Sequence, residues 1–219
     1  MIPDCIEDKG KKNEMIVIVD YGLGNIGSIV NMFKKVGVAA TISSDPAVIE
    51  KADKLILPGV GAFDSGMRNL TERGLVPLLN RRVLEDKVPI LGLCLGMQLF
   101  TKRSEEGQLP GLGWLDAETV RFKFDGDNAH LKIPHMGWNT IRPSRAHPIF
   151  TEMEPEPRFY FVHSYYVVCV NSEDVLAQAV YGFDFTAMLA RGNIIGAQFH
   201  PEKSHKFGMR LLKNFAERV

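Results

Sequence analysis

Apolar runs alternate with amphipathic segments along the first hundred residues, and this alternation restricts the fold more than any other feature of the chain. Residues 15–20 (MIVIVD) form the continuous apolar run of a strand buried on both faces of a parallel sheet. Residues 25–36 then carry apolar side chains at helical spacing. The pattern repeats through strands expected at 39–43, 54–57 and 89–93 and helices expected at 46–51, 64–84 and 95–102, the second of these broken at Gly74 and Pro77. Alternating strands and helices of this length predict right-handed crossovers and a parallel sheet.

Shorter strands, punctuated by glycine and proline, are expected after Gly107. They are predicted at 117–124, 131–133, 159–168, 176–181, 186–190 and 194–199, several of them antiparallel. Residues 190–193 are predicted to form a hairpin turn, and residues 207–219 an amphipathic helix that closes the chain. The predicted fold class is therefore α/β, with an open, mostly parallel sheet flanked by helices and an added antiparallel portion.

The composition is that of an ordinary globular protein, with 219 residues of which 45% are hydrophobic and 24% charged. Residues 1–14 are charged and lack an apolar period, so we predict a disordered extension followed by one domain at 15–219. Basic and acidic residues balance at 26 each, which leaves no net field to hold nucleic acid or an anionic membrane surface. No apolar run is long enough for a membrane span, and the opening residues are too polar for a signal peptide. A cytoplasmic location is expected.

Cys94 is the cysteine that the sequence singles out for chemistry. The three cysteines are an odd number without metal-ligand spacing, which argues against a disulfide framework and a zinc site. Cys94 lies in GLCLG, where an apolar strand ends and a helix begins, and the glycines permit the tight turn of a nucleophile elbow. The helix dipole would favour the thiolate there, and the backbone N–H of Leu95 would point toward an oxyanion. The alternative is that Cys94 is a small buried apolar residue, as most free cysteines are.

A second apolar run, at 194–199, delivers His200 to the same edge of the sheet, with Glu202 two residues later. An extended His-x-Glu segment lets the carboxylate approach the imidazole and fix its tautomer, which would give Cys94 a base and the base an orienting group. The Pro-Cys-x-x-Cys of zinc deaminases does not follow, so neither a metal nor another cofactor is expected. Residues 58–61 (PGVG) end another strand and could donate a second oxyanion N–H, or form a plain turn.

The chain resembles the class I glutamine amidotransferases in four segments, which are PGVG (58–61), LGLCLGMQ (91–98), YFVHSYY (160–166) and QFHPEKS (198–204). Two further segments, DYGLGN (20–25) and PHMGWN (134–139), resemble one branch of that family, the glutaminase subunits of imidazole glycerol phosphate synthases. The resemblance runs from Met15 to the C-terminus. Six segments in the expected order and spacing make it highly specific.

The resemblance implies that glutamine is the substrate, with Cys94 as nucleophile, His200 as general acid and base, and Glu202 as its orienting group. Thiolate attack on the side-chain amide would release ammonia, and water would then cleave the thioester to glutamate. The residues that it implies for binding the substrate and the oxyanion are Gly59, Val60, Gly61, Leu95, Gln98, Glu106, Ser164 and Tyr165. His163 is expected to support its strand, and solvated surface is the alternative for Gln98 and Glu106.

The resemblance also implies a protein partner. Ammonia released into water at neutral pH would become ammonium and lose its nucleophilicity, so a sealed path into the acceptor enzyme is required. In this branch of the family the acceptor is a synthase or cyclase subunit, expected to be a (β/α)8 barrel in a heterodimer. Asn25, Trp138 and Lys203 fall where the resemblance places the interface, with ordinary core as the alternative for Trp138.

Three other functions are compatible with parts of the sequence. Similar glutaminase subunits feed synthases that amidinate sugars of bacterial surface polysaccharides, and residues 102–122 fit either acceptor, although histidine biosynthesis is favoured. The segment GLGNIG at 22–27, with Asp45 downstream, is formally a dinucleotide-binding fingerprint. That function would leave Cys94 and His200 unexplained. A non-catalytic sensor with the same cysteine turn is disfavoured by the paired base and carboxylate.

Overall fold

The computed structural model describes residues 14–219, and the predicted disorder of the N-terminal extension falls almost wholly outside them. Within the described residues, ten strands form one large sheet, and two more form a separate ribbon. The parallel half has the order β2-β1-β3-β4-β12, with neighbouring strands paired in parallel. Its strands are β1 (Ile16–Val19), β2 (Ala40–Ser43), β3 (Lys54–Leu57), β4 (Ile90–Leu93) and β12 (Ile194–Ala197).

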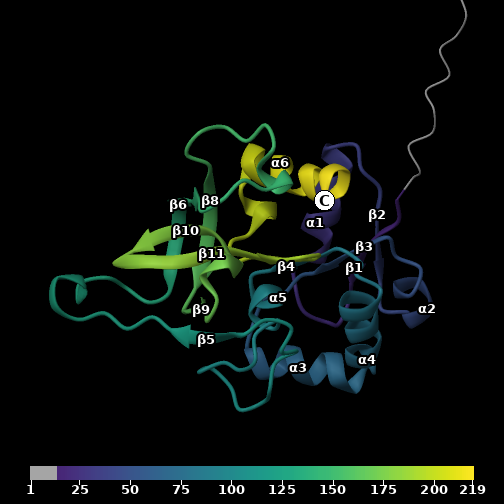
Figure 1. Cartoon of the computed structure of the whole chain (residues 1–219), viewed down its shortest axis with the longest axis horizontal. Helices are drawn as coiled ribbons and strands as arrows, with labels where there is room; N and C mark the ends of the chain where they lie inside the picture. Colours follow the sequence, from purple (N-terminus) through teal and green to yellow (C-terminus); the bar gives the residue numbers. More distant parts are fainter. Residues whose placement is uncertain (1–13) are drawn as a thin grey trace, which may run out of the picture.

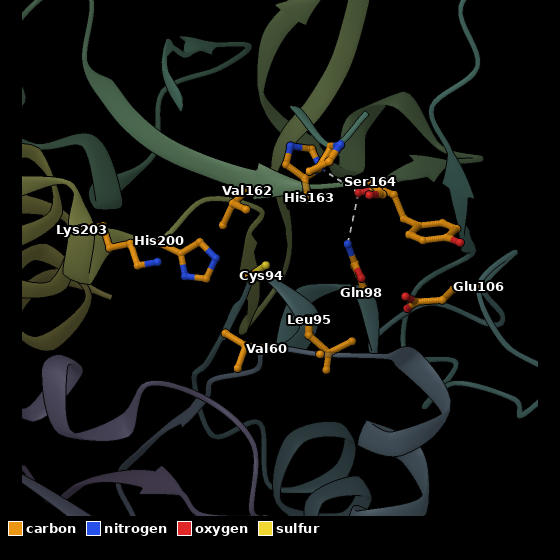
Figure 2. Close-up of a pocket in the computed structure, with 13 residues that line it drawn as sticks. Val60, Cys94, Leu95, Gln98, Glu106, Val162, His163, Ser164, His200 and Lys203 are labelled. Atoms are coloured by element: carbon orange, nitrogen blue, oxygen red, sulfur yellow. Dashed lines mark hydrogen bonds between the residues drawn. The ribbon is translucent and has the colours of Figure 1, made fainter. Parts of the chain in front are cut away.

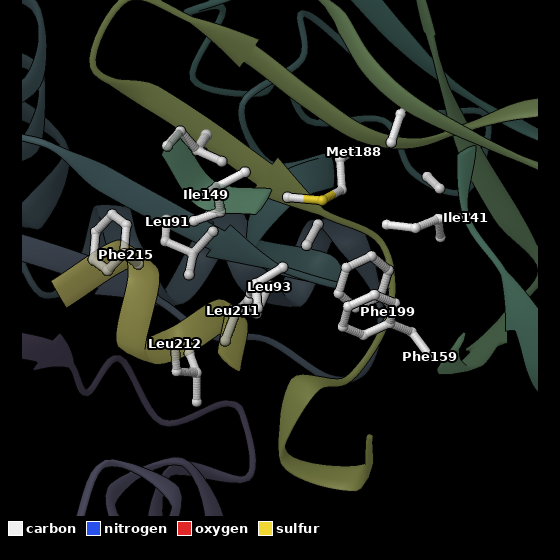
Figure 3. Close-up of a cluster of buried hydrophobic side chains, with 14 of the residues drawn as sticks. Leu91, Leu93, Ile141, Ile149, Phe159, Met188, Phe199, Leu211, Leu212 and Phe215 are labelled. Carbon is white, nitrogen blue, oxygen red and sulfur yellow. The ribbon is translucent and has the colours of Figure 1, made fainter. Parts of the chain in front are cut away.

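Helices cover both faces of this parallel half (Figure 1). One face is covered by α1 (Ile26–Lys35) and α6 (His205–Arg218), whose apolar residues belong to the same core as Ile16 and Ile18 of β1. Figure 3 shows Leu211, Leu212 and Phe215 of α6 in this core with Leu91 and Leu93 of β4. The opposite face packs Val17 and Val19 of β1 against α3 (Phe63–Glu72) and α4 (Leu75–Asn80). Two short helices, α2 (Pro46–Ile49) and α5 (Leu95–Gln98), complete the strand connections. Alternate residues of β1 thus enter two separate cores, which is why the strand is apolar throughout.

The antiparallel half continues the same sheet beyond β12. The order β12-β11-β10-β7 is antiparallel throughout, and β9 pairs with both β11 and β5. The strands are β5 (Ala117–Arg121), β7 (Arg142–Pro143), β9 (Tyr165–Cys169), β10 (Val175–Tyr181) and β11 (Phe183–Arg191). β11 and β12 are joined at Gly192, whose φ of 57° suits a hairpin turn, so the predicted turn at 190–193 is confirmed. The predicted fold class is confirmed as well.

The separate ribbon consists of β6 (His135–Thr140) and β8 (Arg158–His163), which pair antiparallel over their full length. It stands beside the antiparallel half of the sheet in Figure 1. β8 also touches the segment after β12, because the backbone N–H of His200 donates to the Tyr160 carbonyl at 2.9 Å. The ribbon is thereby fixed to one of the predicted site residues.

Four sequence predictions differ from the structure. Residues 131–133 do not form a strand, and the strand predicted at 159–168 is two strands, β8 and β9, separated at Ser164. The helix predicted at 95–102 ends at Gln98, because the N–H groups of Phe100 and Thr101 donate to carbonyls three residues back and that of Lys102 donates to the Ala117 carbonyl. Pro77 does not break α4, since it lies in the first helical turn, where a backbone N–H has no intrahelical partner.

Candidate active site

Three strands that are neighbours in the sheet end at one place. β3 leads into Pro58–Gly61, β4 into Cys94, and β12 into Phe199 and His200. The carboxyl ends of parallel strands form the edge at which open α/β sheets bind ligands. A cavity of about 420 Å³ lies at this edge (Figure 2).

Cys94 occupies a strained turn between β4 and α5. Its φ of 52° and ψ of −108° lie where residues with a side chain are uncommon, so the surrounding packing must hold it there. A Cβ at Gly96 would lie 1.8 Å from the Leu57 carbonyl oxygen, and one at Gly92 would lie 2.6 Å from the Phe100 ring. Glycine on both sides of Cys94 is therefore a steric requirement of the turn.

His200 and Glu202 meet across one short turn of 3-10 helix, Pro201–Lys203. The Nδ1 of His200 and the Oε1 of Glu202 are 2.9 Å apart, and the two side chains are only 5% and 3% exposed. A carboxylate only accepts hydrogen bonds, so Nδ1 carries a proton and Nε2 is left to face Cys94. The Ser204 hydroxyl holds this turn by donating to the His200 carbonyl at 2.6 Å.

The charge state of His200 follows from its partners. Burial lowers the pKa of its imidazole, but the hydrogen bonds to Cys94 and Glu202 and the negative charges of both raise it, with a net pKa of about 10. At neutral pH the imidazole is therefore protonated on both nitrogens, with Nδ1–H donating to Glu202. A protonated imidazole beside a thiolate can deliver that proton to a departing amine.

Eight of the residues predicted around Cys94 and His200 line the cavity. These are Val60, Gly61, Leu95, Gln98, Glu106, Ser164, Tyr165 and Lys203. Gly59 lies outside the lining, packed so closely that a Cβ there would be 2.6 Å from the Tyr21 hydroxyl and 2.9 Å from the Gly96 nitrogen. Asn25 and Trp138 also lie outside it.

The two polar side chains expected to hold the glutamine head group are already partly engaged with the protein. One oxygen of Glu106 accepts the backbone N–H of Phe63 at 2.8 Å, at the start of α3. The Nε2 of Gln98 donates to the Tyr165 carbonyl at 3.2 Å and to Gln198 Oε1 at 3.1 Å. Both side chains face the cavity in Figure 2. Gln98 is 5% exposed, so solvated surface does not describe it, whereas Glu106 is exposed as well as lining the cavity.

Trp138 is not a core residue, because it is 41% exposed on β6. Its indole stacks on the ring of His205 at 5.5 Å between centroids and meets the Tyr160 ring edge to face. The ammonium of Lys203 also lies over the Tyr160 ring, 5.5 Å from its centre. Trp138 and Lys203 thus touch the same aromatic ring next to the cavity.

Sequence reasoning missed two lining residues, Pro134 and Val162, and two buried residues beside the lining, Gln198 and Tyr21. Gln198 is fully buried, and its Nε2 donates to the Cys94 sulfur at 3.7 Å. It lies two residues before His200 on an extended segment, and that period of two could have placed both on one side. Tyr21 is buried too, and its hydroxyl donates to the Pro58 carbonyl at 2.6 Å, under the PGVG loop. Burial, together with the charge of Cys94, raises the pKa of that phenol.

Comparison with known proteins identifies the class. The family model for class-I glutamine amidotransferases matches residues 17–219, and the chain therefore belongs to that family. It is 53% identical to the protein named imidazole glycerol phosphate synthase subunit HisH 2 of Methanococcus maripaludis, over 94% of this chain and 100% of the relative. It is 54% identical to the protein of the same name from Pseudomonas aeruginosa, with the same coverage of both chains.

Solved structures agree at the level of the fold. A structure described as a glutamine amidotransferase matches with a TM-score of 0.71 at 22% identity, over 92% of this chain and 97% of that one. The structure of PurLQS from Thermotoga maritima matches with a TM-score of 0.69 at 16% identity and the same coverage. The chain is thus an enzyme of the glutamine amidotransferase class. The dinucleotide-binding and sensor alternatives lose their basis, and Asp45 has a local role in capping α2, where it accepts from Ala47 N at 2.9 Å.

Proposed function

We propose that this chain is the glutaminase subunit of an imidazole glycerol phosphate synthase, hydrolysing glutamine through Cys94, His200 and Glu202 and passing ammonia to a cyclase subunit. One observation carries the proposed chemistry, which is the buried imidazole of His200, held by the Glu202 carboxylate at 2.9 Å and lining the same cavity as Cys94. The names of the two relatives described above support the assignment to histidine biosynthesis. Because those relatives are biosynthetic enzymes, they also support the expected cytoplasmic location.

The reaction divides between these three residues. The Cys94 thiolate attacks the side-chain amide carbon of glutamine, and the amide oxygen takes up the negative charge of a tetrahedral intermediate. His200 Nε2 gives its proton to the departing nitrogen, so ammonia leaves and a thioester remains. Water then adds to the thioester with His200 now accepting a proton, and glutamate is released. Glu202 holds Nδ1–H throughout and stabilises the imidazolium.

The oxyanion needs two donors, and the chain supplies one from each side of the cavity. The Leu95 N–H is at the start of α5, where backbone N–H groups have no intrahelical acceptor. The second donor is a peptide of the PGVG loop, whose Gly61 has a φ of 106° and free space where a Cβ would stand. Val60 between the two glycines is 41% exposed. We propose that this peptide rotates when the cyclase subunit binds its acceptor, which completes the oxyanion hole only when ammonia can be used.

Glutamine is proposed to lie with its head group against Gln98, Glu106 and the backbone of Ser164 and Tyr165. The cyclase subunit is proposed to be a (β/α)8 barrel that docks over Asn25, Trp138 and Lys203 in a heterodimer. An exposed tryptophan beside a cavity is the kind of residue that dominates protein interfaces. Ammonia would then pass from the cavity into the barrel without meeting bulk water.

Reconstitution tests the acceptor. Glutamate release should be measured for the chain alone, with the imidazole glycerol phosphate cyclase subunit of the same organism, and with that subunit plus its acceptor. We expect turnover to rise by about 10²–10³ on addition of the acceptor, the magnitude of one missing oxyanion donor. Turnover that responds only to a sugar amidotransferase would transfer the same chemistry to polysaccharide synthesis and overturn the assignment.

A further inference from the structure

Two buried histidines outside the proposed triad form a chain of hydrogen bonds with an asparagine of the β6–β8 ribbon. On β6, Met136 and Trp138 face outward with 61% and 41% exposure, so His135 and Asn139 lie on the opposite face. His135 Nδ1 is 3.0 Å from Nε2 of His163, its register partner on β8, and His135 Nε2 is 3.3 Å from the Asn139 amide nitrogen. His163 Nδ1 in turn is 2.7 Å from the Tyr165 carbonyl oxygen.

Elementary hydrogen-bond chemistry fixes the direction of every bond in this line. A carbonyl only accepts, so His163 carries its proton on Nδ1 and presents Nε2 as an acceptor. His135 must then donate from Nδ1, and its Nε2 accepts from the Asn139 amide. Each histidine has one proton, which fits their burial, since desolvation lowers the pKa of His135 to about 4 and that of His163 to about 3.

The same line continues on the other side of the Tyr165 carbonyl to the nucleophile. That oxygen also accepts from Gln98 Nε2 at 3.2 Å, and both bonds to it are drawn in Figure 2. The second proton of Gln98 Nε2 goes to Gln198 Oε1 at 3.1 Å, and Gln198 Nε2 donates to the Cys94 sulfur at 3.7 Å. An unbroken path of side chains and one carbonyl thus connects strand β6 with the sulfur.

We propose that Asn139, His135 and His163 are positioning residues for glutamine hydrolysis, which hold the Tyr165 carbonyl and, through it, the amides of Gln98 and Gln198 against the substrate and the Cys94 sulfur. The inference rests on the proposed function of Cys94 as nucleophile. Without the His135 N–H, the acceptor nitrogen of His163 is buried with no donor, and the ring is held by a single hydrogen bond, the one to the Tyr165 carbonyl. A ring held at one end can shift, and the Tyr165 carbonyl and the Gln98 amide bonded to it then lose their fixed position.

Packing alone is the competing explanation, because the two rings also belong to an aromatic cluster. His135 stacks on Tyr181 with 4.2 Å between ring centres, and His163 lies 5.3 Å from Phe122. Two substitutions of His135 separate packing from hydrogen bonding. His135→Phe keeps the ring and its stacking but has no donor, whereas His135→Asn loses the ring and keeps a donor near the position of Nδ1. If packing alone matters, His135→Phe should be the more active variant. If the hydrogen bond matters, as we propose, His135→Asn should be the more active one.

The experiment has a spectroscopic arm and a kinetic arm. Nitrogen-15 spectra of the histidine rings in the full chain at pH 7 should show His135 and His163 both as the Nδ1–H tautomer. In the complex with the cyclase subunit and its acceptor, His135→Phe should lower kcat/KM for glutamine about ten-fold. His135→Asn should stay within about three-fold of wild type despite a lower Tm. Tyr181→Phe is the matched control, since it removes only a hydroxyl that donates to the Lys132 carbonyl, and it should equal wild type.

An Nε2–H tautomer or a doubly protonated ring at either histidine would overturn the proposal, as would a folded Phe variant at least as active as the Asn variant. Should the Phe variant fail to fold, Asn139→Ala removes the first donor of the path from a half-buried position and should lower kcat/KM two- to three-fold. A wild-type kcat/KM for Asn139→Ala would also overturn the proposal. Failure of the proposed function is distinct, because it appears as an inactive wild-type complex whatever the tautomers.

Discussion

Replacing Glu202 by glutamine isolates the electrostatic part of the proposed triad. The carboxylate is 3% exposed and lies 2.9 Å from His200 Nδ1. Glutamine has almost the same shape, and its carbonyl can still accept the Nδ1–H bond. The substitution therefore removes one buried negative charge while the tautomer and the ring position stay as they are.

The size of the effect follows from the pKa of His200. That pKa is about 10, although burial alone lowers it, so the partners Cys94 and Glu202 must supply the whole increase. Loss of one opposite charge at hydrogen-bonding distance lowers a pKa by about 1–3 units. At about 1.4 kcal/mol per unit, the imidazolium loses about 1.4–4 kcal/mol of stabilisation, a factor on the order of 10–10³ in a step that depends on it.

Glutamate release by the complex, measured from pH 6 to 10, tests this for Glu202→Gln against wild type. We expect kcat to fall by that factor, with the alkaline limb of the profile moved to lower pH. Stability should follow the same group: a folded pKa above the unfolded 6.5 gives stabilisation that is complete below about pH 6.5 and is lost as the pH rises through about 10. The difference in Tm between the two proteins should therefore shrink toward pH 10. A variant with at least half the wild-type kcat and an unmoved profile would refute the reasoning.

Three further substitutions address the nucleophile, the partner surface and the loop. Cys94→Ala should abolish glutamine hydrolysis with an unchanged Tm and leave ammonia-dependent synthesis by the partner intact; glutaminase turnover near the wild-type rate would exclude Cys94 as nucleophile. Trp138→Ala, at a 41% exposed position, should change the Tm by less than about 3 °C yet weaken the coupling of glutamine hydrolysis to synthesis several-fold, and the reverse ranking would make Trp138 a residue of the fold rather than of the interface. Gly61→Val should remove most of the activation by acceptor, because a β-branched residue resists the φ of 106°, and full activation in the variant would exclude rotation of this loop.

The strands that carry the site could be predicted from the sequence, because strands buried on both faces leave continuous apolar runs. The ends of β4 and β12 fall close to their predicted positions, and Cys94 and His200 follow directly from them. β6 could not be predicted in this way. It alternates exposed Met136 and Trp138 with a buried histidine, and the burial of His135 depends on partners that are distant in sequence.

The sequence also could not predict which strands pair with each other. Residues 159–168 have the composition of one strand, yet β8 pairs with β6 in the ribbon while β9 pairs with β5 and β11 in the main sheet. The change occurs at Ser164, whose carbonyl accepts from Phe122 and whose side chain lines the cavity. The role of Gln198 in the site could not be predicted either, because the sequence of a buried strand does not show that the glutamine amide contacts the Cys94 sulfur.

The contact between Gly59 and Gly96 determines where natural or laboratory selection can alter substrate range. A Cβ at Gly59 would stand 2.9 Å from the Gly96 nitrogen, and one at Gly96 would stand 1.8 Å from the Leu57 oxygen, so two main chains touch there with no side chain between them. Neither glycine lines the cavity, but each is next in sequence to a residue that does, Val60 or Leu95, so a side chain added at either glycine would displace that part of the lining. Variants that accept larger amides should therefore arise at lining residues away from this contact, such as Val162 and Ser164.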